Sequence, residues 1–556
     1  MTRARAWLLG SLLAVGCATS TAVALKRPMA PHDASVGGAP MSSAQPVAGA
    51  ALVGRAYTKR VPLMPESERE VPPGLAKARG WLNVTRTPSE ADLKGRVVVL
   101  DFWTSCCINC IHTIPTLSML EKKYATDPVL VIGVHTQKFD AEPEVDRLRA
   151  AMIRLGITHP VAIDGDRGIW EDWGITGWPT VVILDAKGRI VWADSGEPDP
   201  EELDAVIESA LAEGAEQKLL ATTASTFLGR EVDPSGPLAY PEKIAKIPGG
   251  YAIADSGHDR IVFVDEAGKV MDVVGDGTRG KIDGAYAAAR FAHPQGMVAM
   301  GDVVYVADTE NHEIRAIDRK NKRVSTIAGT GVLGEGHIEG EVDGKTTALR
   351  SPWDLAVVSG KLYVALAGSH QIATVDPTTG KIALFAGSGR EDRIDGPRLK
   401  AALAQPSGLA TDGKDLFVLD SETSSVRKIE LASGAVTTLV GKALFVFGDK
   451  DGDGSTARLQ HPVGLAYGEG ALWVADTYNS KIKRIDPKTG ETRTVAAPGP
   501  KHDTLFEPAG LTVMPTTGAG TVLLVADTNH ARIEKVTVGN DAPGPAAWTI
   551  TGLAAP

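Results

Sequence analysis

The hydrophobic positions of this chain follow different patterns in its two halves. Between residues 76 and 215, short and fully apolar runs alternate with stretches in which apolar residues recur at helical spacing. Strands that alternate with helices indicate an α/β domain. Strands are predicted at 97–103, 129–134, 181–184 and 190–192, and helices at 107–124, 141–155 and 200–213.

From residue 236 to residue 556, a pattern of short strands and turns recurs with a period of about 50 residues. Most copies begin with Pro-x-Gly and an apolar residue, and each continues with a strand that ends in an acid, except that Leu366 takes this place in the third copy. Four short strands in each of six copies predict a six-bladed β-propeller. The copies begin at Pro241, Pro294, Pro352, Pro406, Pro462 and Pro508.

The composition of the chain argues against some classes of protein. The chain has 556 residues, a formal net charge of −10 and 43% hydrophobic residues, which is typical of a soluble protein with more than one domain. This composition argues against a disordered chain, and the acidic balance gives no support for a nucleic-acid partner.

The N-terminus reads as a targeting segment. Arg3 and Arg5 precede an apolar run at 6–15, which is shorter than the roughly 20 residues that span a bilayer. We therefore expect a signal peptide over residues 1–24. Two endings compete: Cys17 follows a run like a bacterial lipobox and would become the lipidated first residue, whereas 22–24 is an A-x-A site for ordinary cleavage. We favour the lipoprotein, located in the periplasm or cell envelope and touching the membrane only through its lipid anchor.

Two further segments are expected to connect domains. Residues 25–75 are rich in Ala, Pro, Ser and Gly and predict a flexible tether. Residues 216–235 are assigned as a linker between the α/β domain at 76–215 and the propeller at 236–556.

The cysteines point to chemistry rather than to structural cross-links. Cys106, Cys107 and Cys110 lie within five residues, and no cysteine follows them. A helix N-terminus stabilises a thiolate and lowers its pKa, and two intervening residues let the second thiol reach the first sulfur. We expect Cys107 to attack and Cys110 to resolve a mixed disulfide.

The segment 102–110 resembles the active-site stretch of membrane-tethered reductases in the thioredoxin superfamily. The resemblance implies that Asp101 relays protons to Cys110, that Pro115 kinks the active-site helix, and that Pro179, with Trp178, docks substrate as a cis-proline. Two departures stand out: Cys106 replaces the usual Trp, which makes it a candidate modulator, and Ile108-Asn109 replaces the common Gly-Pro.

Other interpretations of the cysteines stay open. A zinc site would need a second cysteine pair, and copper delivery through Cys106 and Cys110 would need a distant histidine, for which His135 and His159 are available. The domain could also be a redox-silent relic. We expect neither a metal nor a cofactor. The stretch 449–454 begins like an EF-hand loop, but Gln460 stands where the bidentate Glu belongs.

Turn residues connect the propeller to a known repeat. Asn311-His312 and Asn529-His530 stand where NHL repeats carry Asn-His, and His258, His370 and Asn479 are partial matches that we expect to stabilise the turns. From about residue 76 to 537 the chain is similar to the NHL repeat-containing protein 2 family, which combines a thioredoxin-like domain with an NHL propeller. We interpret it as an exported bacterial form.

The propeller is expected to bind a protein partner. In an antiparallel blade the second hairpin turn and the blade-to-blade linker lie on one face, here called the linker face, and the linkers are long, as at 275–294 and 387–406. They share Asp-Gly pairs at 283–284, 343–344, 395–396 and 453–454. An enzymatic site in the central channel would need repeated metal ligands on the innermost strands, which the sequence does not show.

We therefore predict an envelope thiol–disulfide oxidoreductase that acts on protein thiols or disulfides, with the propeller as its partner-binding module. The alternative is a non-enzymatic interaction scaffold that keeps a redox-silent thioredoxin-like fold.

Overall fold

The computed structural model describes residues 52, 56–232, 236–499, 502–515, 520–539 and 546–553. They form two compact units: one contains the described residues up to Gln137 together with Leu155–Val232, and the other contains Lys138–Arg154 and the described residues from 236 onward. The expected signal peptide, Cys17 and the tether up to residue 51 lie outside the described residues. Within the described ranges, no helix combines the length and apolar character that crossing a membrane requires.

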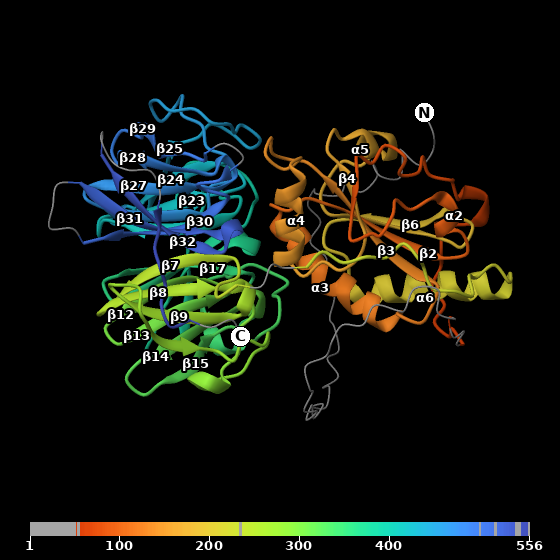
Figure 1. Cartoon of the computed structure of the whole chain (residues 1–556), viewed down its shortest axis with the longest axis horizontal. Coiled ribbons are helices and arrows are strands. Elements are labelled where there is room, and N and C mark those ends of the chain that lie inside the picture. The colour runs from red at the N-terminus through yellow and green to blue at the C-terminus, as the bar shows by residue number, and fades with distance from the viewer. Residues whose placement is uncertain are drawn as a thin grey trace. The chain divides into compact units, whose positions relative to one another are not determined.

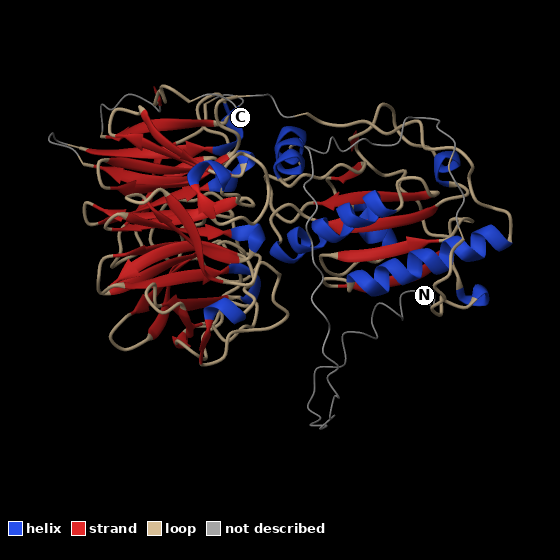
Figure 2. Ribbon diagram, turned by 90° about the horizontal axis from the view of Figure 1, so that it is seen from below, coloured by secondary structure: helices blue, strands red, loops and turns tan. Residues whose placement is uncertain are grey.

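The first unit is a six-stranded sheet with helices on its faces (Figures 1 and 2). The strand order is β1-β4-β3-β2-β5-β6, in which β2, β3 and β4 run parallel, β5 is antiparallel to both β2 and β6, and β1 is antiparallel to β4. This is the thioredoxin arrangement that the pattern predicts, with β4 and α5 as additions that their short lengths hid. The strands are β1 (Trp81–Leu82), β2 (Val97–Trp103), β3 (Val129–Thr136), β4 (Val161–Asp164), β5 (Thr180–Leu184) and β6 (Ile190–Ser195); the α-helices are α2 (Glu90–Leu93), α3 (Ile108–Lys123), α5 (Gly168–Trp173) and α6 (Pro200–Glu216).

Strand β2 is buried on both faces, as its apolar run, interrupted only by Asp101, requires. On one face Val97 and Val99 pack with side chains of α3 and α6, and on the other Phe102 packs with Trp173 of α5, their ring centroids 5.4 Å apart. The tryptophans at 170, 173 and 178 therefore belong to this core.

Two segments that the sequence assigns to a tether and a linker pack on this unit. Tyr57 is buried and its hydroxyl donates to Asp127 Oδ1 at 2.8 Å. Arg69 forms a two-pronged ion pair with Glu213 at 2.6 and 2.8 Å. Phe227, in the expected linker, is fully buried in the core. Parts of the expected tether therefore pack on the first unit through Tyr57 and Arg69, and the expected linker packs on it through Phe227.

The second unit is a six-bladed antiparallel propeller (Figure 1). The first three blades are β7 (Pro241–Ile247), β8 (Gly250–Asp255), β9 (Arg260–Asp265) and β10 (Val270–Val274); β12 (Pro294–Met300), β13 (Val303–Asp308), β14 (Glu313–Asp318) and β15 (Arg323–Ala328) with β11 (Gly284–Ala285) at the edge; and β17 (Pro352–Val358), β18 (Lys361–Leu366), β19 (Gln371–Val375) and β20 (Lys381–Ala386) with β16 (Glu341–Asp343) at the edge.

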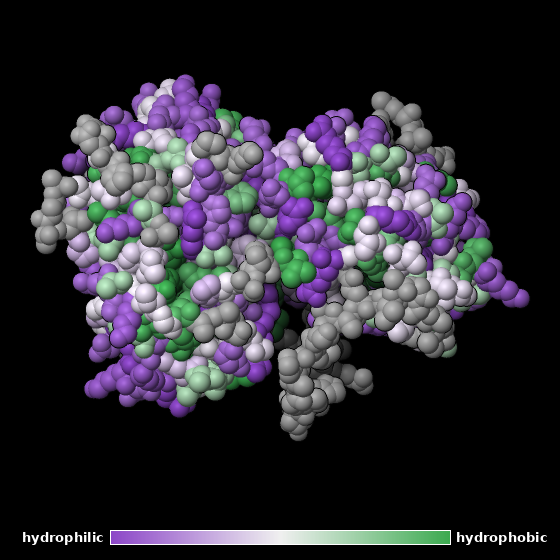
Figure 3. All heavy atoms as spheres, viewed as in Figure 1, coloured by the Kyte–Doolittle hydropathy of each residue, from purple (hydrophilic) through white to green (hydrophobic). Residues whose placement is uncertain are grey.

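The last three blades are β22 (Pro406–Thr411), β23 (Asp415–Asp420), β24 (Ser425–Glu430) and β25 (Ala435–Val440) with β21 (Gly396–Pro397) at the edge; β26 (Gly464–Gly468), β27 (Ala471–Asp476), β28 (Lys481–Ile485) and β29 (Thr492–Ala496); and β30 (Pro508–Met514), β31 (Thr521–Asp527), β32 (Arg532–Val538) and β33 (Ala546–Ala547). The face of each unit turned toward the viewer in Figure 3 mixes hydrophilic and hydrophobic residues.

An Asp-Ser or Asp-Thr pair at the end of the second strand holds each of five blades in the ring. The carboxylate of Asp308 accepts a hydrogen bond from Ala292 N at 2.8 Å, just before the first strand of the same blade. The hydroxyl of Thr309 donates to Pro352 O, at the start of the next blade, at 2.7 Å. The same bonds occur at Asp255-Ser256, Asp420-Ser421, Asp476-Thr477 and Asp527-Thr528.

The third blade replaces this polar arrangement in a consistent way. In the second blade, buried Asp308 pairs with buried Arg315 at 2.6 Å, and Asp420 with Arg427 does the same in the fourth. The third blade has Leu366 and Ala373 at these two positions, which lie diagonally across the same strand pair, as Asp308 and Arg315 do. Because acid and base are both missing, no buried charge is left alone.

The Pro-x-Gly glycines allow the innermost strands to approach one another. A Cβ on Gly510 would lie 2.1 Å from Glu242 O, and one on Gly296 would lie 2.4 Å from the Cα of Asp354. In the first blade Lys243 stands in place of this glycine, and its ammonium donates to Ser407 O at 3.1 Å and lies 3.6 Å from Asp354 Oδ2.

The segment Lys138–Arg154, which includes α4 (Val145–Arg154), packs on the propeller although it lies between β3 and β4 in the sequence. Arg147 donates to Glu507 Oε1 at 2.9 Å and to Ser480 Oγ at 3.2 Å. The Phe139 ring lies 4.7 Å from that of Phe447. These partners belong to linkers and turns, so the segment docks on the linker face.

Candidate functional site

The cysteine pair lies where a parallel strand turns into a helix. Strand β2 ends at Trp103, and Cys107 is the N-cap of α3, with Cys110 in the first turn. Cys106, Cys107 and Cys110 carry free thiols. Cys107 keeps 8% of its surface exposed while Cys110 keeps 0%. The geometry therefore gives Cys107 the positive helix terminus and the better access to a substrate.

Cys110 is a thiol that resists ionisation. Burial raises its pKa well above the ordinary value, and the hydrogen bond that the thiol donates to Cys107 and the charges of Cys107 and Asp101 raise the pKa further. At neutral pH this thiol keeps its proton and needs a base before it can attack. Asp101 lies close enough to influence it.

Asp101 has the properties of that base. It is 1% exposed, and burial raises the pKa of its carboxyl to about 7, an effect that His159 opposes. A carboxyl with this pKa can accept and release a proton near neutral pH.

Trp178 and Pro179 precede β5, next to β2 in the sheet. The peptide bond between them is cis, as the resemblance implies. The ring of Trp178 lies 4.4 Å from that of Trp170, so the side chain is held by the core on one side. Pro115 lies inside α3, as expected.

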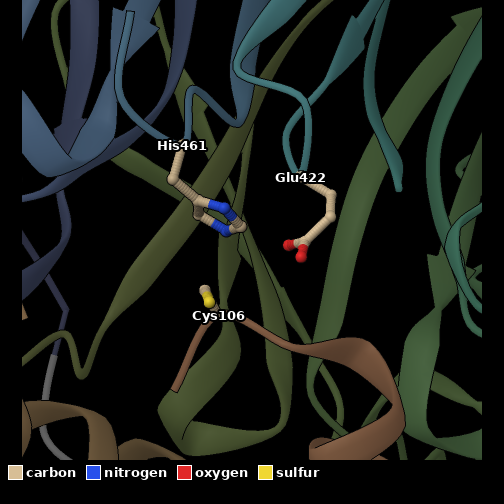
Figure 4. Close-up of side chains that lie close together, drawn as sticks. All are labelled: Cys106, Glu422 and His461. Atoms are coloured by element: carbon tan, nitrogen blue, oxygen red, sulfur yellow. The ribbon is translucent and has the colours of Figure 1, made fainter. Parts of the chain in front are cut away.

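Cys106 is buried in the loop before α3, where its sulfur lies 3.7 Å from Thr104 Oγ1 (Figure 4). Cys106 therefore contacts a polar side chain and precedes the expected nucleophile, Cys107, directly in the sequence.

Both histidines that the sequence offers for copper have other neighbours in this unit. His135 accepts a hydrogen bond from Ser105 N at 3.3 Å and packs edge-on against Trp103. His159 Nδ1 lies 3.3 Å from Glu121 Oε2. His112, which sequence reasoning missed, contacts Glu197 at 2.7 Å. The sequence carried no signal for these pairs because each joins distant positions.

The propeller unit holds a second group of buried titratable side chains on its linker face. Figure 4 shows the Glu422 carboxylate and the His461 imidazole, which approach within 4.8 Å. Lys138 forms an ion pair with Glu422, and burial lowers the pKa of His461 to about 3. Glu422 is thus charge-balanced, and His461 stays neutral between Phe139 and Tyr478.

Some Asn and His residues of the turns hold their own turns, whereas Asn529 donates to Glu507 and His312 accepts from Ser351 N in other segments. Asn311 and Asn479 donate to the strand-end acids Asp308 and Asp476, each at 2.8 Å. His258 contacts Asp255 at 3.0 Å in the same way.

The acidic stretch that begins like an EF-hand is paired with a lysine. Asp449 and Asp451 contact Lys483 at 2.8 and 3.1 Å. Asp451-Gly452, rather than the expected 453–454, occupies the place of Asp283-Gly284, because Asp451 accepts from Thr494 N as Asp283 does from Thr326 N.

Known proteins resemble both units. The thioredoxin-like family model matches residues 95–190. NHL repeat-containing protein 2 of Homo sapiens is 39% identical over 511 residues, covering 84% of this chain and 69% of that protein. Protein SUPPRESSOR OF QUENCHING 1, chloroplastic, of Arabidopsis thaliana is 39% identical over 485 residues, which is 82% of this chain and 46% of that protein.

Over the first unit alone, the thiol-disulfide oxidoreductase ResA of Bacillus thuringiensis is 30% identical over 117 residues, 21% of this chain and 65% of that protein. This chain spans less than half of the Arabidopsis relative but more than two thirds of the human one. With a thioredoxin-like domain, a six-bladed propeller and this identity along most of its length, the chain belongs to the NHL repeat-containing protein 2 family.

Proposed function

We propose that the chain is a thiol–disulfide oxidoreductase that uses Cys107 and Cys110. The observation that carries this proposal is the pairing of an N-capping Cys107 with a buried Cys110 whose pKa is raised, beside a carboxyl whose pKa is about 7. The name of the Bacillus thuringiensis relative supports the same reaction class.

The exchange is balanced as follows. The Cys107 thiolate attacks one sulfur of a protein disulfide and forms a mixed disulfide, and the other substrate sulfur leaves as a thiolate that takes a proton from water. Asp101 accepts the Cys110 proton, the Cys110 thiolate attacks Cys107 Sγ, and the second substrate sulfur leaves as a thiolate that also takes a proton from water. The substrate gains two electrons and two protons, the chain gains a Cys107–Cys110 disulfide, and a protein dithiol reverses every step.

Trp178 and Pro179 would contact the substrate backbone, as the resemblance implies, and Cys106 would modulate the pair. The reaction would take place in the cell envelope, with the chain held by a lipid on Cys17. No resident metal or cofactor enters this scheme.

The first experiment is the reduction potential of the cysteine pair in the full chain. The protein is equilibrated with glutathione buffers, its thiols are alkylated, and each cysteine is read by mass spectrometry. We expect a reversible two-electron couple between about −120 and −270 mV. The Cys106→Ser variant should keep this couple.

A second arm captures the intermediate. The Cys110→Ser variant should retain substrate as a mixed disulfide on Cys107, and the matched Cys107→Ser variant should retain none. A Cys107–Cys110 pair that forms no couple, or one well below −300 mV, would favour the interaction scaffold instead.

We further propose that the linker face binds a protein partner through apolar contacts. Four large hydrophobic side chains in the linkers between the first four blades are at least one-third exposed, and exposed apolar side chains that gather on one face mark interaction sites. They are Ile282, Val332, Ile394 and Leu399. The docking of 138–154 on other linkers of this face supports the same use of the surface.

Site-directed photo-crosslinking in envelope extracts tests this proposal. A photoreactive side chain at Ile394 or Leu399 should give a discrete protein adduct. The same side chain at Met271, which is about as exposed as Ile394 but lies on β10, should give none. Equal adducts at all three positions would contradict a partner on the linker face.

A further inference from the structure

Three buried polar atoms of the first unit belong to residues that neighbour Gly133, and they have no hydrogen-bond partner among the described residues. They are Asp101 Oδ1, Trp103 Nε1 and His159 Nε2. Asp101, Trp103 and His159 are each at most 2% exposed. An unpaired polar atom in a protein interior costs roughly 1–3 kcal/mol, so three together call for a common explanation.

Gly133 allows these side chains to pack closely against β3. It pairs with Asp101 across β2 and β3 and with Val161 across β3 and β4. A Cβ on Gly133 would lie 2.8 Å from Trp103 Nε1 and 3.3 Å from His159 Nε2. Both nitrogens therefore lie close to Gly133, where a residue with a side chain would not fit without displacing them.

The hydrogen-bonding capacities of the three atoms match one water molecule. The Trp103 indole can only donate. His159 Nδ1 lies against the Glu121 carboxylate, which can only accept, so Nδ1 carries the hydrogen and Nε2 is left as an acceptor. Asp101 Oδ1 is the second acceptor. A water that accepts from Trp103 and donates to His159 and Asp101 makes three bonds, the usual number for a buried water.

Glu121 connects this group to solvent. It lies on α3, and its side chain is 23% exposed while that of His159 is 2% exposed. Thr158 Oγ1 also donates to Glu121 Oε2, at 3.2 Å, and holds the carboxylate toward His159. The buried side of His159 thus faces Asp101 and its surface side faces an acid in contact with water.

We propose that a buried water beside Gly133, His159 and Glu121 form the route by which the proton of Cys110 leaves Asp101 for solvent. This inference rests on the proposed function, because it names the residues that remove the proton from Asp101, the base of the proposed thiol–disulfide exchange. Asp101 passes the proton of Cys110 through the water to His159 Nε2, and His159 gives the proton on Nδ1 to Glu121 and from there to solvent. One proton enters and one leaves, and no electron moves.

The groups around Asp101 are few. Cys107 and Cys110 lie at the start of α3, Val181 lies opposite Asp101 on β5, Gly133 lies opposite it on β3, and His159 lowers its pKa. A change at His159 or Glu121 should therefore appear in the titration of Asp101 and in the step that uses it.

The kinetic test separates the two cysteines. Reduced full chain is mixed with Ellman's reagent, which releases one thionitrobenzoate when Cys107 attacks and a second when Cys110 resolves. We expect the second release in the wild type to accelerate with an apparent pKa near 7. In His159→Gln and Glu121→Gln it should slow about tenfold or more at pH 7 and lose this pH dependence, while the first release is unchanged.

The control variant is Glu216→Gln, which removes a carboxylate from α6 that pairs with Arg60. It should match the wild type in both releases. Second releases of wild-type rate and pH profile in both relay variants would overturn the proposal.

An equilibrium measurement keeps this inference separate from the reaction. The Asp101 carboxyl is titrated by carbon-13 chemical shift in the reduced full chain, with Asp101→Asn to assign the signal. His159 lowers the pKa of Asp101, so His159→Gln should raise it. An unchanged titration refutes the route even if exchange occurs, and a raised pKa without any second release in the wild type would refute the proposed function instead.

Discussion

Asp101 is a carboxyl that folding makes harder to ionise. Burial raises its pKa from 3.8 to about 7, so the folded state binds a proton more tightly than the unfolded state between these values. The stability that Asp101 contributes is therefore present below pH 4 and is lost as the pH rises through 7.

Asp101→Asn should stabilise the first unit at pH 8, by an amount on the order of 4 kcal/mol, and the gain should shrink toward pH 4. Hydrogen–deuterium exchange of peptides from β2 in the full chain measures it. Asp92→Asn is the opposite control, because the hydrogen bond from Arg86 holds the Asp92 pKa below its ordinary value. That variant should lose stability at pH 8, and a gain there would contradict the sign of the argument.

The residues of the candidate site differ in how far sequence can predict them. Asp101, Cys107 and Cys110 stand at fixed spacings within one strand–helix unit, so their neighbours are set locally. Glu121 and His159 are 38 positions apart and meet only because α3 packs over the start of β4. Local sequence carries no trace of such a pair.

At the scale of elements, a side-chain hydrogen bond helps to close the ring of blades, where the sixth and first blades also share a buried apolar cluster. Thr528 Oγ1 donates to Pro241 O at 2.8 Å and so joins the sixth blade to the first. Thr528→Val keeps the shape but leaves the Pro241 carbonyl without this donor, which should cost about 1–3 kcal/mol.

The effect should appear as faster hydrogen exchange in β7 and β30, the first strands of the joined blades. Thr537 is a half-buried residue of β32 in the same sixth blade, so Thr537→Val is the matched control. This substitution should leave the hydrogen exchange of β7 and β30 unchanged. Equal exchange in both variants would mean that the hydroxyl does not hold the ring.

The blades could be predicted because each strand is a local pattern that is repeated. The edge strands β11, β16 and β21 could not, since each is two or three residues long and is defined by pairing with a strand far along the chain. The same reason hid β4, which has four residues.

At the scale of the whole molecule, the segment 138–154 depends on one arginine. Arg147 is 4% exposed and pairs with buried Glu507. Arg147→Ala leaves a buried carboxylate with less compensation, which should cost about 3 kcal/mol or more and release the segment from the linker face.

Limited proteolysis of the full chain, with cleavage sites mapped by mass spectrometry, would detect this release as new cuts between 138 and 154. Arg149 pairs with Asp146 on the same helix and is 38% exposed at its side chain, so Arg149→Ala should leave the segment resistant. A resistant Arg147→Ala chain would show that the aromatic contacts of Phe139 suffice.

The helix in this segment was predictable, but its destination was not. The apolar spacing at 141–155 predicts a helix with one buried face but does not say which surface covers that face. The helix lies between strands of the α/β domain in the sequence, which places it within that domain. The contacts instead come from the propeller sequence, such as Gln460, which lies 319 positions from Ala141 and accepts from its N.

The position of this segment limits how genes of this kind can be recombined. Part of the propeller's surface is encoded inside the thioredoxin-like sequence, between two strands of its sheet. A recombination near residue 235 that replaced the thioredoxin-like half with a foreign one would remove the segment 138–154 from the propeller. The side chains of Phe447, Tyr478 and His461, which contact Phe139, would then be exposed to solvent. Lineages that keep the propeller are therefore expected to inherit both halves together, or to carry a graft of 138–154 with every new partner.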